Sequence, residues 1–133
     1  RQILAVERLR ELQRAALDVY VDPSLVAYTV SLAEATRDPA AYGVPDVADL
    51  VAYGASPRGP ISLVQSARAL ALVHGREYVL GSDVRGLAKD ALRHRLVLTY
   101  RALAEGRTAD DVLDAVLEKV PAPPLELGRP IAA

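Results

Sequence analysis

Apolar and polar residues alternate along most of this chain with the spacing of amphipathic helices. The first eighteen residues carry apolar side chains at three- and four-residue intervals, with charged side chains between them. Asp22-Pro23 ends this pattern and has the sequence of a helix start, in which a capping side chain precedes a proline at the first helical position. The pattern therefore predicts one helix before Asp22 and a second one from Pro23 towards Arg37.

Three further helices are predicted in the rest of the chain. The longest apolar pattern follows Ser56 and ends at Gly75, and the next begins at Ser82 or Asp83. The last begins after Thr108, and Asp111 three residues later completes the sequence of a capping box. The predicted core faces of these helices are, in order, Ile61, Val64, Ala67, Leu70, Ala71 and Leu72; Val84, Leu87, Ala88, Ala91 and Leu92; and Val112, Leu113, Val116, Leu117 and Val120.

The segments between these patterns are shorter and less regular. Residues 37–54 contain prolines and glycines among scattered apolar residues, which predicts a connecting loop. Residues 77–80 resemble a short strand, and residues 95–100 fit either a short strand or a continuation of the preceding helix. The sequence thus predicts an all-α bundle of about five helices over residues 1–120, with at most a minimal β-hairpin. Residues 121–133 form a proline-rich tail that is expected to be a linker or a strap along the surface.

Composition narrows the class of protein. With 133 residues, 51% hydrophobic and 25% charged, and a net charge of −1, the chain is typical of a soluble globular domain. The near-neutral charge argues against nucleic acid as a partner, and no apolar run is long enough to span a membrane. A cytoplasmic location follows only by elimination. Because the chain starts at Arg1 and contains no methionine, we expect it to be part of a larger protein.

Most kinds of active site lack their sequence signals here. The chain has no cysteine, neither of the glycine-rich phosphate-binding motifs GxxxxGK[ST] and GxGxxG, and no spacing that indicates a serine–histidine–acid triad. The only histidines, His74 and His94, lie on different predicted elements without carboxylates at metal-ligand spacing, so no metal site is expected. Catalysis by this chain alone is therefore not expected.

The stretch "YGASPRGP" (residues 53–60) carries the one unusual charge. If Ser56 caps the helix and Pro57 opens it, Arg58 places a cation at the helix end that favours anions. A guanidinium beside a helix N-terminus suits a phosphate group, and the side-chain-free Gly54 and Gly59 would keep the approach open. The alternative is that Arg58 reaches into solvent or pairs with an aspartate, either Asp46 or Asp49.

The order of several motifs resembles one protein family. Gly54–Arg58 is followed by Gly75–Val79, then Asp83-Val84, then His94-Arg95, and residues 19–38 are similar to the helix that precedes the first motif. Together these residues resemble the C-terminal lid domain of MoxR-type AAA+ ATPases over roughly residues 2–100. The combination is specific, whereas "SPR" by itself would be a weak signal.

The resemblance implies a role for Arg58 as the sensor 2 arginine, which reaches from the lid to the ATP phosphates. Arg58 is then the candidate catalytic residue, and Ser56 and Arg58 are the candidate cofactor-binding residues. The resemblance also implies ATP with Mg, held mainly by a core domain of the same polypeptide that carries the Walker motifs. It further implies a homo-oligomeric ring, chaperone-like action and protein partners with von Willebrand factor A domains. The parent protein would be the ATPase, and this chain alone would be inactive.

Two other functions are compatible with a helical bundle. The first is a free-standing interaction module that binds a partner helix in a groove. The second is a helical nucleic-acid-binding domain, which the near-neutral charge disfavours.

Overall fold

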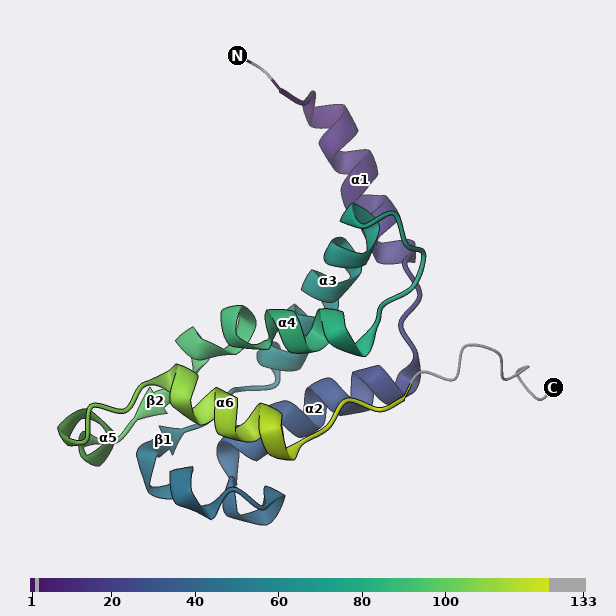
Figure 1. Cartoon of the computed structure of the whole chain (residues 1–133). Coiled ribbons are helices and arrows are strands. Elements are labelled where there is room, and N and C mark those ends of the chain that lie inside the picture. The colour runs from purple at the N-terminus through teal and green to yellow at the C-terminus, as the bar shows by residue number, and fades with distance from the viewer. Residues whose placement is uncertain (2, 125–133) are drawn as a thin grey trace.

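The computed structural model describes residues 1 and 3–124 and shows a helical bundle with a very small sheet (Figure 1). Helices α2, α3, α4 and α6 pack together, α1 contacts α3 and projects beyond the bundle, and α5 lies with the sheet at the opposite end. The all-α prediction is confirmed. The elements, with η for 3₁₀-helices, are α1 (Val6–Asp18), α2 (Pro23–Arg37), η1 (Ala40–Tyr42), η2 (Pro45–Leu50), β1 (Val51–Tyr53), α3 (Arg58–Val73), α4 (Gly81–Leu92), η3 (Arg93–Arg95), β2 (Val97–Leu98), α5 (Tyr100–Ala104) and α6 (Ala109–Lys119).

The core is built from one face of each bundle helix. On α4 the buried apolar residues are Val84, Ala88 and Leu92, which recur every four residues as the sequence pattern predicted. The four buried residues of α6 also match the prediction. On α3 the prediction is partly wrong, because Leu63 is buried whereas Ile61 is 58% exposed. The buried face of α3 starts at Gly59 and Pro60, so Ile61 points to the open side of the helix.

Two predicted helix caps are present. The Asp22 side chain accepts a hydrogen bond from Ser24 N–H at 2.8 Å, which satisfies one of the free donors at the start of α2. At the start of α6, Thr108 N–H donates to Asp111 Oδ2 and Asp111 N–H donates to Thr108 Oγ1, which is the predicted capping box. Both helix starts were predicted correctly, because a cap is an interaction between neighbouring residues that the local sequence determines.

The sheet differs from the predicted hairpin. Strands β1 and β2 pair antiparallel, with Val51 opposite Leu98 and Tyr53 opposite Val97, but α3 and α4 lie between them in sequence. The extended alternative for residues 95–100 is therefore confirmed. The loop prediction for residues 37–54 is wrong in part, because this segment contains η1, η2 and β1. It folds since Val47 and Leu50 of η2 are buried in the core.

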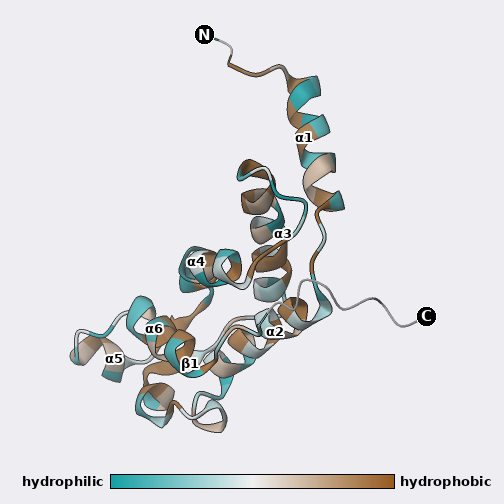
Figure 2. Cartoon of the chain, turned by 45° about the vertical axis from the view of Figure 1, so that its right-hand side comes forward, coloured by the Kyte–Doolittle hydropathy of each residue, from teal (hydrophilic) through white to brown (hydrophobic). Residues whose placement is uncertain are grey.

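The two ends of the described chain differ in how closely they pack on the bundle. Helix α1 buries none of its residues fully, but it contacts α3 and half-buries Leu12, Ala15 and Ala16, while apolar and polar residues occur along its length (Figure 2). At the other end, Ala122 packs against the core, so the proline-rich tail follows the surface as far as Pro124. The remaining tail, residues 125–133, lies outside the described residues. No helix in the described part of the chain is long and apolar enough to span a membrane.

We expect Leu63→Ala to lower the free energy of unfolding by ~3 kcal/mol, because Leu63 is fully buried and its truncation leaves a cavity. Urea unfolding followed by circular dichroism measures this change. Leu103→Ala is the matched control, since Leu103 is largely exposed, and it should change the free energy by less than ~0.5 kcal/mol. Equal effects of the two substitutions would show that the core is placed incorrectly.

Candidate functional site

The loop before α3 is fastened to the end of α2. Ala55 is fully buried, its N–H donates to Thr36 Oγ1 at 2.8 Å, and its carbonyl accepts from Arg37 Nε at 2.7 Å. Thr36 Oγ1 also donates to the carbonyl of Ala33, so this buried hydroxyl both donates and accepts a hydrogen bond. The loop thus has a rigid mount, although it contains no helix or strand of its own.

Two glycines on either side of Ser56–Arg58 permit close packing. A Cβ on Gly54 would lie 2.5 Å from the carbonyl oxygen of Thr36, which is backbone and cannot easily move. A Cβ on Gly59 would lie 2.9 Å from Cδ2 of Leu92 on α4. The sequence predicted that these glycines keep the approach to Arg58 open, whereas the structure shows that they bring the loop and α3 against α2 and α4.

Arg58 is the first residue of α3 and its side chain is exposed. It forms no hydrogen bond or ion pair with any residue that the structure describes. Neither Asp46 nor Asp49 pairs with Arg58, and Asp49 accepts from Arg101 at 2.8 Å instead, so of the alternative's two forms the structure shows the side chain that reaches into solvent. Arg37, Arg76, Arg93 and Arg95 differ from Arg58 in that each donates to a carbonyl, a hydroxyl or a carboxylate. Arg58 is therefore an available cation on a fixed backbone.

Ser56 does not cap α3, which corrects the prediction. The residue before the helix is Pro57 in a helical conformation, no side chain caps the helix, and Ser56 instead accepts from Gly59 N–H through its carbonyl at 2.8 Å. Because Pro57 and Pro60 have no N–H and Gly59 has used its own, this helix end offers few backbone donors. Any anion here would depend on the side chains of Arg58 and Ser56 more than on the backbone.

An open apolar groove of about 610 Å³ runs between α2 and α3 and reaches Pro57 at one end. We call it the α2–α3 groove. Val26, Val30 and Ala33 line it from α2, and Ile61 and Val64 line it from α3, with Arg68 at the far end. Its near end is formed by Arg37 of α2 and by Pro57, the residue directly before Arg58.

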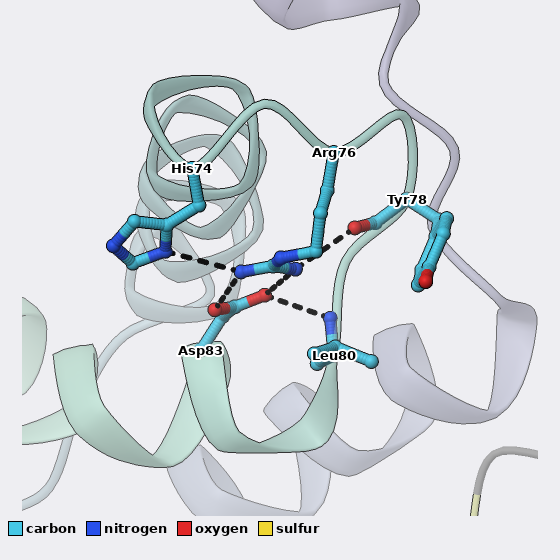
Figure 3. A network of polar contacts seen from close by, with 5 residues as sticks. All are labelled: His74, Arg76, Tyr78, Leu80 and Asp83. Carbon is cyan, nitrogen blue, oxygen red and sulfur yellow. Dashed lines mark hydrogen bonds and ion pairs between the residues drawn. The ribbon is translucent and has the colours of Figure 1, made fainter.

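A second polar cluster holds the connection between α3 and α4 (Figure 3). The Arg76 guanidinium donates to both oxygens of Asp83, at 2.8 and 2.7 Å, and to the carbonyl of Tyr78 at 3.1 Å. Asp83 is 5% exposed and also accepts from Leu80 N–H at 2.8 Å, and His74 Nδ1 lies 3.2 Å from Nη2 of Arg76. Asp83 rather than Ser82 therefore supplies the side chain at the start of α4. The cluster is structural, because Arg76 has no free donor pair left for a ligand.

The pKa of Asp83 lies below its usual value. Burial alone would raise this pKa, but the hydrogen bonds from Arg76 and from Leu80 N–H outweigh burial and favour the carboxylate. The sequence marked Arg76 and Asp83 only as parts of a family motif and did not predict that they pair. The sequence contains only one hint of the pair: an arginine and an aspartate seven residues apart on either side of a predicted helix start. Because the two residues do not lie in one helix, helical spacing could not indicate that they meet.

No group of three or more His, Asp or Glu side chains in the described ranges could hold a metal ion. His74 belongs to the Arg76 cluster, whereas His94 lies in η3 at the opposite end of α4.

Comparison with known proteins supports the resemblance seen in the sequence. A family model described as the AAA lid domain matches residues 45–116. "Chaperone MoxR1" of Mycobacterium tuberculosis is 46% identical over 123 residues, which cover 92% of this chain and 33% of that protein. "Protein MoxR" of Paracoccus denitrificans is 37% identical over 110 residues, 78% of this chain and 32% of that protein.

Among solved structures, a candidate ATPase from Cytophaga hutchinsonii matches with a TM-score of 0.89 and 35% identity. The match covers 93% of this chain and 38% of that one. The chain thus spans about a third of the length of these relatives.

We expect Gly54→Ala to destabilise the domain by ~2–3 kcal/mol, because the added methyl group meets backbone atoms of α2 and the loop must shift. Thermal and urea unfolding measure this effect. Gly86→Ala is the control, since a Cβ there meets nothing within 4 Å and Gly86 is in the interior of α4. The control should stabilise the domain by ~0.5–1 kcal/mol. A neutral Gly54→Ala would contradict the close approach of the loop to α2.

We expect Asp83→Asn to lower the free energy of unfolding by ~3 kcal/mol near neutral pH, because Arg76 loses its charged partner in a largely buried pair. Since the pKa of Asp83 is lower in the folded protein, its contribution is complete above the unfolded pKa of about 3.9 and is lost as the pH falls through the folded value. The difference from the wild type should therefore shrink in acid. Urea unfolding at several pH values measures it.

The control for this experiment is Asp90→Asn on the same helix, because the Asp90 side chain is 69% exposed and pairs only at the surface. It should cost less than ~1 kcal/mol at any of these pH values. An Asp83→Asn variant with the same small, pH-independent effect would show that the pair does not stabilise the fold.

Proposed function

This chain belongs to the AAA lid domain family, as a lid of the MoxR type, and we propose that it senses ATP through Arg58. In this proposal the Arg58 guanidinium reaches out of the lid to the phosphates of ATP bound by the core domain of the same polypeptide. Ser56, whose hydroxyl is exposed and not used as a cap, adds a second, weaker contact beside it.

The observation that carries the proposal is an unpaired guanidinium on a rigid mount. Arg58 is exposed and has no partner among the described residues, and Ala55 three residues earlier is locked to α2 by two hydrogen bonds. Because the backbone near Arg58 is fixed, only the long side chain has to orient when negative charge develops near it. Phosphoryl transfer is accelerated mainly by positioning and by such fixed positive charge, so this arrangement fits the chemistry of ATP hydrolysis.

The proposal assigns the rest of the chemistry to the core domain. The Walker motifs that hold ATP with Mg are absent from this sequence, so the domain by itself would not hydrolyse ATP. When bound, ATP supplies the phosphates whose charge Arg58 stabilises. Because Arg58 lies on the lid and the other contacts on the core, breaking the phosphate contact would release the lid, which gives a hinge motion between two domains.

The wider role of the protein is also part of this proposal. We expect a cytoplasmic ATPase that forms a homo-oligomeric ring and remodels partner proteins. The name of the Mycobacterium tuberculosis relative, a chaperone, supports the remodelling role. Partners with von Willebrand factor A domains rest on the family resemblance alone.

A free-standing interaction module remains the second candidate, and the α2–α3 groove is the observation in its favour. It predicts no ATPase activity in the polypeptide that carries the domain, so one activity measurement separates the two functions.

We expect Arg58→Ala to lower the ATPase rate of the complete polypeptide by ~100-fold, which is the scale of losing one fixed charge that stabilises the transition state. The steady-state rate at saturating ATP measures it. Because Arg58 is exposed and unpaired, the variant should keep the wild-type melting temperature.

Arg58→Lys and Arg107→Ala are the controls. The lysine variant retains the charge and should recover part of the rate, and Arg107 makes only a long surface contact of 3.9 Å with Asp111. An ATPase rate that Arg58→Ala leaves unchanged would exclude the sensing role.

A further inference from the structure

Arg95 lies beside the start of α3, although the proposed function gives it no role. It is the last residue of η3, which directly follows α4. Its Nε donates to the carbonyl of Ala91 at 2.9 Å, and its Nη2 donates to Ser62 Oγ at 2.9 Å. Its Cδ is 3.8 Å from the place that a Cβ on Gly59 would take. The Arg95 side chain therefore crosses from the end of α4 to the first two turns of α3.

The hydrogen bond to Ser62 places this guanidinium next to Arg58. Arg58 and Ser62 are four residues apart in α3, so their side chains are neighbours on the helix surface, with about 6 Å between their Cβ atoms. The Cβ of Ser62 also tilts towards the N-terminus of the helix, which is the end that carries Arg58. Two arginines from different elements thus share one surface at the start of α3.

No carboxylate in the described part of the chain balances the charge of either arginine. Arg95 donates only to a carbonyl and a hydroxyl, which are neutral acceptors, and its Nη1 donates to no described residue. Arg58 has no described partner at all. Arg93, two residues before Arg95, is different because it pairs with Asp90 and Asp110. The uncompensated positive charge is therefore a property of Arg58 and Arg95 and not of every arginine nearby.

Contacts inside the domain do not account for the charge of Arg95. Two like charges on one surface repel each other, and the N-terminus of α3 adds its own partial positive charge. A tie between η3 and α3 requires only hydrogen-bond donors, which an uncharged amide side chain also has. An anion in front of both arginines would replace the repulsion by attraction. A planar guanidinium with an unused Nη suits a phosphate oxygen in particular.

We propose that Arg95 is a second phosphate-binding arginine of this lid, which contacts the nucleotide beside Arg58. The inference rests on the proposed function, in which ATP held by the core domain faces Arg58. Arg95 donates through Nη1 to a phosphate oxygen, while its Nε and Nη2 keep their hydrogen bonds to Ala91 and Ser62. Because these bonds already hold the guanidinium, the phosphate contact immobilises little further side-chain freedom.

The two arginines differ in what their loss should change. Arg95 is held in one position, so it contacts the phosphates before and during the reaction alike. An interaction of equal strength in the bound state and the transition state affects nucleotide affinity and leaves the rate at saturation largely unaltered. We therefore expect Arg95 to act on the Kd for the nucleotide, in contrast to the effect on the saturated rate that is expected of Arg58.

Isothermal titration of the complete polypeptide with Mg²⁺ and AMP-PNP, an ATP analogue that is not hydrolysed, tests the proposal. Arg95→Gln removes the charge but keeps an aliphatic stem beside Gly59 and an amide donor. We expect it to raise the Kd for AMP-PNP by ~10-fold, which is the scale of one charge-assisted hydrogen bond. The ATPase rate at saturating ATP should fall by less than ~3-fold.

Arg93→Gln is the matched control. It removes the same charge from the same 3₁₀-helix, at a position where Asp90 and Asp110 already balance it. The Kd for AMP-PNP should stay within ~2-fold of the wild-type value, because exposed ion pairs contribute little.

Ser62→Ala separates the charge from the tie between η3 and α3. It removes the hydrogen bond from Arg95 and leaves the guanidinium, so the Kd should rise by less than ~3-fold. Thermal unfolding followed by circular dichroism confirms that each variant is folded at the temperature of the titration. If Arg95→Gln does not fold, Arg95→Lys takes its place, and a ~3-fold higher Kd is expected because lysine keeps the charge but not the planar fork.

Four results would overturn the proposal. They are a Kd that Arg95→Gln leaves unchanged, an equal increase with Ser62→Ala, an equal increase with Arg93→Gln and, where Arg95→Lys is used, a wild-type Kd in that variant. The first and the last would exclude the contact. The second would make Arg95 a structural tie, and the third would reduce it to a general effect of charge.

Failure of this inference can be told apart from failure of the proposed function. A rate that collapses with Arg58→Ala, together with an unchanged Kd in Arg95→Gln, would remove the second arginine and keep the sensor. An unchanged Arg58→Ala rate, together with a ~10-fold higher Kd in Arg95→Gln, would do the reverse.

Discussion

The contact between Thr36, Arg37 and Ala55 is the constraint on which the functional surface depends. It joins the last turn of α2 to the residue three positions before Arg58, through one hydrogen bond in each direction. Gly54 makes the contact possible, because any side chain there would meet the α2 backbone. The same contact sets the spacing of α2 and α3, and so it shapes the groove between them as well as the mount of Arg58. One interaction thus positions both parts of the surface.

Arg58 and Arg76 differ in whether the domain itself uses their guanidinium groups. Arg76 spends its donors on Asp83 and on the Tyr78 carbonyl, which closes the connection between α3 and α4 and leaves nothing for a ligand. Arg58 lies at the other end of α3 and is held through its backbone alone. A cation fixed by its main chain keeps its guanidinium available, which is what a contact across a domain boundary requires.

The sequence predicted those features that depend on neighbours along the chain. The five longer helices and the caps at Asp22 and Thr108 follow from local patterns, and the structure confirms them. The sequence could not predict which side of α3 is buried. That side depends on α2 and α4, which both pack on α3 and leave Ile61 facing the groove. The sequence wrongly predicted Ser56 as the cap of α3 for a related reason. The loop that contains Ser56 is fixed by hydrogen bonds to α2 and not by the start of α3. The short η1, η2 and α5 and the Arg76–Asp83 pair also depend on distant packing.

The groove and Arg58 are more informative together than either is alone. An apolar groove by itself fits many partners, and an exposed arginine by itself fits solvent. Here the groove ends at Pro57, the residue directly before the free Arg58, and Arg68 lies at its other end. Under the proposed function, a contact at the groove and a contact of Arg58 with phosphates would therefore act on the same end of α3, which is the physical requirement for coupling the two.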